Sequence, residues 1–371
     1  MRVTEKINSQ ILLSNMNTVG LRRSDLMKKL STGRNIHAPS DDPEGLKKVL
    51  KFDKELKQMD RYLSNIEEAR VWLNETESAL SNVMDQANSA VSTALRAAND
   101  SIGEDERKNL ATLIQDVYEA VVIEANRQYN DAYLFGGTVV SGSPFELSTS
   151  VEEEQFTGQS EPFQLDFTDI SGSTVTVTSS DGLTAFAKDV DFTLDRETGK
   201  ISRLATGSMA EGQTYLISYE TKRPMNLTVN ADGTDGAVRR EIFHDESEQI
   251  NFSGQSVFID DNNLFQSLID LKNGLMRNDQ QAIKGSYADL KSSLDQIVRY
   301  ASQAGMKYER LALSEESLKS LQINLNALKS EVQDADMAQL AIDFEKTETL
   351  YSAMLKAGAR LMQQSLIDYL Q

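Results

Sequence analysis

The sequence predicts a mainly α-helical protein with an inserted β domain, in which the N- and C-terminal segments form a long antiparallel helical bundle or coiled coil around a β-rich middle. Three observations predict it. An apolar stripe with alternating spacings of three and four runs from Leu46 to Ala98 without Pro or Gly. Heptads return between about 287 and 335. Between these regions, over 139–261, the apolar period becomes two.

The first long helix carries its stripe at fifteen positions, of which thirteen are apolar. At 1.5 Å per residue such a helix is roughly 80 Å long and needs partner helices of similar length. The two exceptions, Arg70 and Glu77, lie one heptad apart, so they either meet polar partners or mark where the seam rotates. The stripe consists of Val49, Phe52, Leu56, Met59, Leu63, Ile66, Arg70, Leu73, Glu77, Leu80, Met84, Ala87, Val91, Ala94 and Ala98.

Composition excludes several classes of function. The chain has 371 residues, a formal charge of −19 and no Cys, so it has no disulfide, no thiolate catalysis and no Cys-based metal site. The negative charge argues against nucleic acid and anionic membranes as partners. The apolar run Ile11–Leu13 is too short for a signal peptide, and no segment approaches the ~18 apolar residues that membrane insertion requires.

Before the long helix, residues 1–32 form a helix with Asn and Ser diluting its apolar positions, and Gly33 is expected to cap it. Asp41 or Asp42 then caps the long helix, with Pro43 in its first turn. After it, Ser101–Glu104 fits a capping box for a third helix over 104–131, folded back antiparallel. Paired glycines in Tyr133–Thr138 predict a switch from helix to strand.

The insert, residues 139–261, is expected to contain eight or so short strands. Candidate strands are Val175–Thr178, Val190–Leu194, Tyr215–Tyr219 and Asn226–Val229, separated by the turn pairs Asp181–Gly182, Asp232–Gly233 and Asp235–Gly236. Because composition and period change at both borders, we expect that residues 145–250 can be deleted without loss of the helical core.

Helix resumes near Asn263, and Asn278–Asp279 marks a joint before the second long helix. That helix repeats an apolar residue every seven positions, at Leu290, Ile297, Ala304, Leu311, Leu318, Leu325 and Val332. We expect it to run antiparallel to the first.

The last helix, Met337–Leu370, is apolar on nearly every side between Leu350 and Leu370, which is typical of a buried helix. Only the 1–32 helix remains to cover it, so we expect other copies of the chain to bury the surplus. The predicted subunit interface comprises Ile7, Ile11 (or its neighbour Leu12), Met16, Val19, Leu26, Leu30, Leu350, Met354, Leu361, Leu366 and Leu370.

The sequence contains no pattern for catalysis, a cofactor or a metal. It has no GxxxxGK[ST], GxGxxG or HExxH motif. The stretch Asn230–Gly236 resembles a calcium loop but lacks an oxygen ligand at its fifth position and a well-placed Glu, so hairpin turns explain it better. His37 and His244 have no partner at metal-ligand spacing. We therefore predict no catalytic residue, no cofactor and no metal.

Three domains follow from these assignments. Residues 1–42 and 336–371 form a terminal helical assembly domain, residues 43–138 and 262–335 a long helical bundle domain, and residues 139–261 a β-rich outer domain.

Several motifs at both ends identify a family. They are Leu30–Ile36, Pro39–Pro43, Trp72–Leu80, Tyr133–Thr138, Asp334–Asp336, Ala357–Met362 and Ser365–Leu370. With them the chain resembles the bacterial flagellin superfamily, and within it the hook-associated branch, because flagellins proper usually carry Ala where Pro39 and Pro43 stand. The resemblance covers about 1–138 and 262–371 and does not reach the insert.

The resemblance implies a structural adaptor, not an enzyme, that joins the hook of the bacterial flagellum to its filament. It implies export by the flagellar secretion apparatus, a cytoplasmic export chaperone and assembly outside the cell. Its partners would be hook-associated protein 1 on the hook side, flagellin on the filament side and copies of itself in a tubular ring. The alternatives are a flagellin-type filament subunit, a secreted helical effector with a host target, and an enzyme whose site would lie in the insert.

Overall fold

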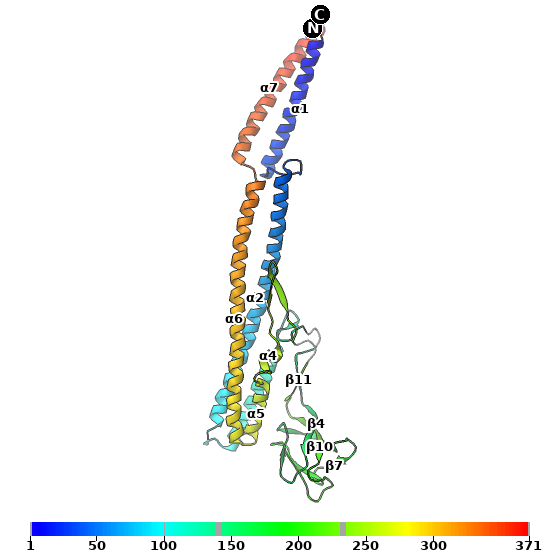
Figure 1. Cartoon of the computed structure of the whole chain (residues 1–371), viewed down its shortest axis with the longest axis vertical. Helices are drawn as coiled ribbons and strands as arrows, with labels where there is room; N and C mark the ends of the chain where they lie inside the picture. The colour runs from blue at the N-terminus through cyan, green and yellow to red at the C-terminus, as the bar shows by residue number, and fades with distance from the viewer. Residues whose placement is uncertain (1, 100, 139–141, 231–234, 370–371) are drawn as a thin grey trace. The chain divides into compact units, whose positions relative to one another are not determined.

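The computed structural model describes residues 2–99, 101–138, 142–230 and 235–369, and in the terminal helices it describes side chains at Ile7 and from Gln10 to Arg360. Within this range the helices are α1 (Arg2–Thr32), α2 (Pro43–Ala97), α3 (Glu104–Ala125), α4 (Gly254–Phe258), α5 (Leu264–Met276), α6 (Gln280–Gln333) and α7 (Met337–Tyr369). The predicted mainly α-helical protein with an inserted β domain is confirmed (Figure 1). By its contacts the chain forms two compact units, 1–62 with 316–371 and 63–315, and α2 and α6 contribute to both.

The long helices α2 and α6 are antiparallel, as predicted. In the first unit Lys329 Nζ lies 2.6 Å from Asp53 Oδ1. In the second unit Arg70 pairs with Glu315. Also in the first unit, Gln322 Nε2 donates to Asp60 Oδ1 at 2.7 Å, so the partner's number on α6 falls as the number on α2 rises.

The buried stripe of α2 shifts by one residue at Arg70, which corrects the predicted seam. Up to Ile66 the buried positions are those of the sequence pattern, but beyond it Ala69 and Thr76 are fully buried in place of Arg70 and Glu77. The reason is that further segments lie against this part of α2: Asn65 Nδ2 donates to Glu241 O, the Trp72 ring lies 6.2 Å from that of Tyr129, and α3 follows from Asn82 on, which donates to Glu124. The downstream core positions are Ala69, Leu73, Thr76, Leu80, Val83, Ala87, Ala90, Ala94 and Ala97.

Arg70 itself meets polar partners on α6. Its Nη2 donates a 2.8 Å hydrogen bond to Tyr308 Oη, and its guanidinium lies 4.7 Å from the centre of that ring. The hydrogen bond to Tyr308, together with the Glu315 carboxylate, raises the pKa of Arg70 above its usual value. Glu77 is exposed. Of the two explanations that the sequence left open, polar partners apply at Arg70 and rotation of the seam applies at Glu77.

The predicted capping box of α3 is wrong. Gly103 is the N-cap of this helix and no side chain caps it. Ser101 is already engaged by the preceding turn, because its N and Oγ both donate to Asn99 Oδ1 at 3.2 Å. The end of α2 is closed instead by Arg107, which is 7% exposed and donates from Nε to Ala97 O and from Nη2 to Asn99 O, both at 3.2 Å.

Helix α3 ends at Ala125, earlier than the predicted 131, because the chain turns into a hairpin of β1 (Gln128–Tyr129) and β2 (Ala132–Tyr133). Asn130 and Asp131 between them have positive φ of 48° and 62°, as a two-residue hairpin turn requires. Asn263 caps α5, since its Oδ1 accepts a 3.0 Å hydrogen bond from Gln266 N. The joint between α5 and α6 lies at Arg277–Asp279, as expected.

The described part of the insert contains eleven short strands, more than the eight or so expected. Strands β4, β10, β6 and β7 form one antiparallel sheet, β5, β9 and β8 a second, and the pairs β11–β3 and β12–β13 two further two-stranded sheets. The Asp181–Gly182 pair forms the β6–β7 turn, whereas Asp232–Gly233 lies outside the described residues. The strands are β3 (Phe145–Ser148), β4 (Ser150–Thr157), β5 (Phe163–Gln164), β6 (Ile170–Ser179), β7 (Ala185–Phe186), β8 (Phe192–Asp195), β9 (Lys200–Arg203), β10 (Thr214–Thr221), β11 (Asn226–Val229), β12 (Arg239–Phe243) and β13 (Glu246–Gln249).

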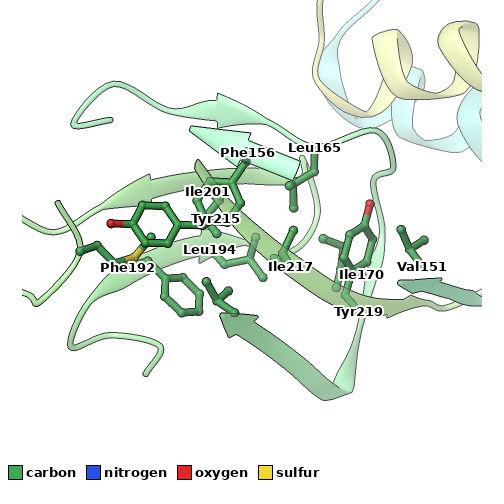
Figure 2. Packing of buried hydrophobic residues seen from close by; sticks show 12 residues of the cluster. Val151, Phe156, Leu165, Ile170, Phe192, Leu194, Ile201, Tyr215, Ile217 and Tyr219 are labelled. Atoms are coloured by element: carbon green, nitrogen blue, oxygen red, sulfur yellow. The ribbon is translucent and has the colours of Figure 1, made fainter. Parts of the chain in front are cut away.

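The two larger sheets share a hydrophobic core of their own. Figure 2 shows side chains from both sheets meeting in it, among them Ile217 of β10 and Ile201 of β9, both with no exposed surface. Strand β10 alternates exposed or half-buried with buried residues along its length, the pattern of a strand with one face on a core. This core lies within residues 151–219, so these two sheets, hereafter the distal sheets, bury their apolar surface without the helices.

The rest of the insert, outside the distal sheets, packs against the helical bundle. The ring of Phe145 lies 5.8 Å from that of Phe258 and 5.1 Å from that of Phe265. Tyr118 Oη on α3 donates a 2.9 Å hydrogen bond to Met225 O. On the other side of the bundle, Glu248 of β13 is 8% exposed and pairs with Lys307 of α6 at 2.7 Å. These contacts correct the expectation that 145–250 is dispensable.

The contacts of the distal sheets with α5 are polar. Asn273 donates from Nδ2 to Asp166 O at 2.6 Å, and its Oδ1 accepts from Thr168 Oγ1 at 2.9 Å. Arg277 Nη2 donates to Leu165 O at 2.7 Å. Water can replace all of these bonds when the partner is removed.

We therefore expect a narrower deletion to be tolerated. Thr221 N donates a 2.8 Å hydrogen bond to Thr149 O, so a short Gly-Ser link can replace 150–220. The shortened protein should keep its helicity and melt within about 5 °C of the full chain. Deletion of 145–250 removes Phe145 and Glu248 as well and should lower the melting temperature by at least about 10 °C. Far-UV circular dichroism during heating compares the two variants. Equal melting temperatures would contradict the distinction between the distal sheets and the rest of the insert.

Candidate assembly interface

The terminal helices α1 and α7 form an antiparallel pair (Figure 1). Gly358 of α7 lies against Leu12 and Met16 of α1, and Gly20 of α1 lies against Tyr351 of α7. One row of buried and half-buried positions on each helix follows alternating spacings of four and three. They are Leu12, Met16, Val19, Arg23, Leu26 and Leu30 on α1, and Leu340, Phe344, Thr347, Tyr351, Met354 and Gly358 on α7.

Arg23 occupies one position of this seam. Its guanidinium carbon lies 5.0 Å from the centre of the Tyr351 ring, and its Nε lies 3.4 Å from Glu348 Oε2. A charged side chain in an apolar seam is satisfied only in the register that brings its partners opposite. Arg23 therefore fixes how α1 slides against α7, at the cost of one apolar contact.

Backbone hydrogen bonds join the chain between α1 and α2 to the chain between α6 and α7. Ala335 N donates to Gly33 O at 3.0 Å, and Asn35 N donates to Gln333 O at 2.8 Å. Gly33 has φ of +69°, which a glycine adopts without strain, so α1 stops here. The two helical connections are thus held together by a short antiparallel bridge between Arg34 and Asp334.

Adjacent aspartates close the loop that follows. Asp42 Oδ1 accepts from Glu44 N at 3.1 Å and Gly45 N at 3.0 Å, which makes Asp42 the cap of α2. Asp41 Oδ2 accepts from His37 N and Ala38 N, and these backbone N–H groups hold the pKa of Asp41 below its usual value. The pair is helix-end chemistry, as the sequence indicated.

The pair of terminal helices leaves large apolar side chains exposed on both members. Each is between 46% and 67% exposed, far more than a seam residue such as Leu26 at 8%. Exposed apolar side chains in this number on a soluble protein indicate a surface that another molecule covers. They are Ile7, Ile11, Leu13, Leu21 and Met27 on α1, and Met337, Ile342, Leu350 and Leu355 on α7.

The residues predicted for the subunit interface fall into three groups. Leu26 is buried, and Met16, Val19, Leu30 and Met354 are half-buried in the α1–α7 seam. Ile7, Ile11 and Leu350 are 47%, 53% and 49% exposed, outside the seam. The side chains of Leu361, Leu366 and Leu370 lie outside the described residues.

The predicted stripe therefore divides between two surfaces. Counting back from Leu30 in steps of four and three, the seam reaches Leu12 and not Ile11, so Ile11 turns away from α7. Sequence reasoning missed six exposed apolar residues, namely Leu13, Leu21, Met27, Met337, Ile342 and Leu355. They could have been identified from the sequence as the apolar residues of the two helices that do not fall on the single seam.

Two further kinds of site have no residues for them in the part of the chain that the structure describes. None of its helices is long and apolar enough to cross a membrane. Across those residues, no three His, Asp or Glu side chains are grouped so that they could hold a metal ion. His37 Nε2 lies 2.5 Å from Thr32 Oγ1 inside the loop, and His244 is exposed beside Asp245.

Two sequence families match the ends of the chain. The family described as bacterial flagellin N-terminal helical region matches residues 3–139. The family described as bacterial flagellin C-terminal helical region matches residues 288–370. Together the two matches cover α1, α2, α3, α7 and most of α6, and they leave most of the insert outside.

Individual relatives extend this likeness. The chain is 27% identical to flagellar hook-associated protein 3 of Salmonella typhimurium over 153 residues, which is 39% of this chain and 47% of that protein. The chain thus spans about half the length of this relative. It is 23% identical to polar flagellin C of Vibrio parahaemolyticus over 372 residues, 93% of each chain.

A solved structure shares the fold. It is described as a flagellar hook-associated protein from Vibrio parahaemolyticus, and it superposes with a TM-score of 0.54 at 14% identity, over 79% of this chain and 100% of that one. The helical ends with a β-rich middle are therefore an architecture known from experiment. The resemblance inferred from the terminal motifs is confirmed.

Proposed function

Because the chain belongs to the bacterial flagellin family, a family of structural flagellar proteins, we propose that it is the adaptor that joins the hook of the flagellum to the filament. The observation that carries the proposal is the α1–α7 pair, whose exposed apolar side chains call for neighbours. The likeness to hook-associated protein 3 and the motif Pro39–Pro43 favour the junction over the filament. The chain acts by shape and contact, and catalysis has no part in it.

Its proposed partners are hook-associated protein 1 on the hook side, flagellin on the filament side, further copies of the chain in a tubular ring, and an export chaperone in the cytoplasm. The chain leaves the cell through the flagellar secretion apparatus and assembles outside. Residues 1–42 and 336–371 form the assembly domain, 43–138 and 262–335 the wall of the tube, and 139–261 the outer domain.

A filament subunit is the second candidate, because polar flagellin C matches 93% of the chain. Gold-labelled antibody on purified flagella separates the two. Label confined to the junction of hook and filament is expected. Label along the whole filament would show that the chain is a filament subunit and not the adaptor. Flagella without label would overturn both roles.

The exposed Leu350 of α7 provides a mutational test. Leu350 is 49% exposed in the single chain, so Leu350→Asp should change the free energy of unfolding by less than about 0.5 kcal/mol. In the assembly it would bury a charge in an apolar contact, which costs several kcal/mol on the general scale of such burial. Cells with this variant should build hooks, release unassembled flagellin into the medium and swim poorly.

Leu183→Asp is the matched control. Leu183 lies on the β6–β7 turn and is 85% exposed, outside the terminal helices. This variant should swim normally. Full-length attached filaments and normal motility with Leu350→Asp would show that Leu350 lies outside the subunit contact.

A further inference from the structure

Charge is divided unevenly between the two compact units. The unit formed by residues 1–62 and 316–371 contains eighteen Lys and Arg against sixteen Asp and Glu, a formal charge of +2. Residues 63–315 contain twenty Lys and Arg against 41 Asp and Glu, a formal charge of −21. Two copies of the chain whose 63–315 units touched would repel one another, because both units are strongly negative. A ring of such chains needs a contact that offsets this repulsion.

The first part of α2 carries a basic face. Six cations stand within fifteen residues, and all six are exposed: Lys47, Lys48, Lys51, Lys54, Lys57 and Arg61. Lys47, Lys51, Lys54 and Arg61 are spaced by four, three and seven, so they lie on one side of the helix. The buried residues of this segment, such as Val49 and Leu56, lie on the other side, toward α6.

These cations are largely unpaired within the chain. Among the residues that the structure describes, only Lys51 of the six has an ion pair, a 3.8 Å contact with Glu55 one turn away. Leu50 stands among them and is 59% exposed. The basic face is therefore an open surface with an apolar residue beside its charges, which is suited to an acidic protein partner.

The same helix supplies the complementary charge further along. Over 67–85 it carries Glu67, Glu68, Glu75, Glu77 and Asp85, and the only cation in that stretch, Arg70, is turned into the α2–α6 seam. Glu67, Glu77 and Asp85 are exposed, and no ion pair to them exists among the described residues. Glu68 and Glu75 pair with Arg240 and Arg127 of the same chain, so Glu67, Glu77 and Asp85 are the acids of this stretch that are open to a basic partner.

We propose that the basic face of α2, residues 47–61, binds the acidic stretch of α2, residues 67–85, on a second copy of this chain. Because the two surfaces differ, each copy can give its basic face to one neighbour and its acidic stretch to another. Such a head-to-tail contact repeats from copy to copy, which is the form that a tubular ring requires. The contact rests on the proposed assembly and adds a charge-based specificity to its apolar terminal helices.

Sedimentation velocity of the purified full-length chain tests this contact. In about 20 mM NaCl the average mass should rise with protein concentration and pass that of a dimer, and in about 500 mM NaCl it should return to the monomer because salt screens exposed charges. Lys47→Glu with Lys54→Glu should weaken association at low salt by at least about tenfold. Glu67→Lys with Glu77→Lys should do the same.

A mixture of the two double variants is the decisive sample. The acidified face of the first variant meets the basic stretch of the second, and the reverse contact is also restored, so the equimolar mixture should associate like the unmodified chain. Lys284→Glu with Lys291→Glu is the matched control. Both lysines are exposed on α6, and the net charge changes by the same amount without touching either surface. Circular dichroism checks that all variants are folded.

The proposal is overturned if the unmodified chain stays monomeric at low salt, if it stops at a dimer, if the control loses association equally, or if the mixture fails to restore it. The antibody experiment is independent of these outcomes. If the chain associates through its charges but the antibody does not label the junction, only the proposed adaptor role is overturned. Label at the junction without such association would remove this contact alone.

Discussion

Replacing Phe258 by Ala is expected to lower the free energy of unfolding of residues 63–315 by about 3–5 kcal/mol, the cost of emptying a large aromatic site in a core. Phe258 has no exposed surface. Its ring lies 5.1 Å from that of Phe135 and 5.7 Å from that of Phe265. The ring therefore joins the helix-to-strand switch before the insert to the helix after it.

Urea unfolding followed by the fluorescence of Trp72, the single Trp of the chain, measures this cost, because Trp72 lies in the same unit. The exposed Leu183→Ala should shift the midpoint by less than about 0.5 kcal/mol. A loss below about 1 kcal/mol for Phe258→Ala would mean that the insert borders are not tied together through this ring.

The second large effect is a dependence of stability on pH that arises in the insert. Burial raises the pKa of Glu154 from 4.5 to about 7, in spite of the hydrogen bonds that its carboxyl group accepts. Tyr219 Oη donates to its Oε2 at 2.5 Å, and Asp166 N donates to its Oε1 at 2.7 Å. The same burial raises the pKa of Tyr219.

Since the pKa of Glu154 is higher in the folded protein than in the unfolded chain, folding favours the protonated carboxyl. This contribution to stability is complete below pH 4.5 and is lost as the pH rises through 7. The loss is about 1.4 kcal/mol per pH unit over this window, about 3 kcal/mol in all.

Glu154→Gln should remove this slope, so its free energy of unfolding relative to the unmodified chain should rise by about 3 kcal/mol between pH 4.5 and pH 8. Urea unfolding at several pH values measures the difference. Glu152→Gln, an exposed residue of the same strand, is the control and should leave the profile unchanged. Parallel profiles for Glu154→Gln and the unmodified chain would show that the carboxyl is solvated.

Most of the helical architecture follows from local pattern. Stripes spaced by three and four predicted α2 and α6 with their antiparallel pairing, because a stripe that long can be buried only by another helix of similar length. End signals worked where one residue serves one helix, as at Gly33 and Asp42. The prediction for Ser101 failed because Asn99 had already engaged that side chain in a tighter turn.

The sequence by itself determined the helices, the β-rich middle, the family and the surplus of apolar residues at the ends. Only the tertiary structure decided which sides of those elements are buried. Where residues 129 and 241 lie against α2, Ala69 is buried in place of Arg70, because a side chain packs against whichever neighbours surround it. The seam passes through Leu12 and leaves Ile11 exposed, and Phe145 belongs to the helical bundle rather than to the distal sheets. Periodicity defines one face of one element, whereas burial depends on every element packed against it.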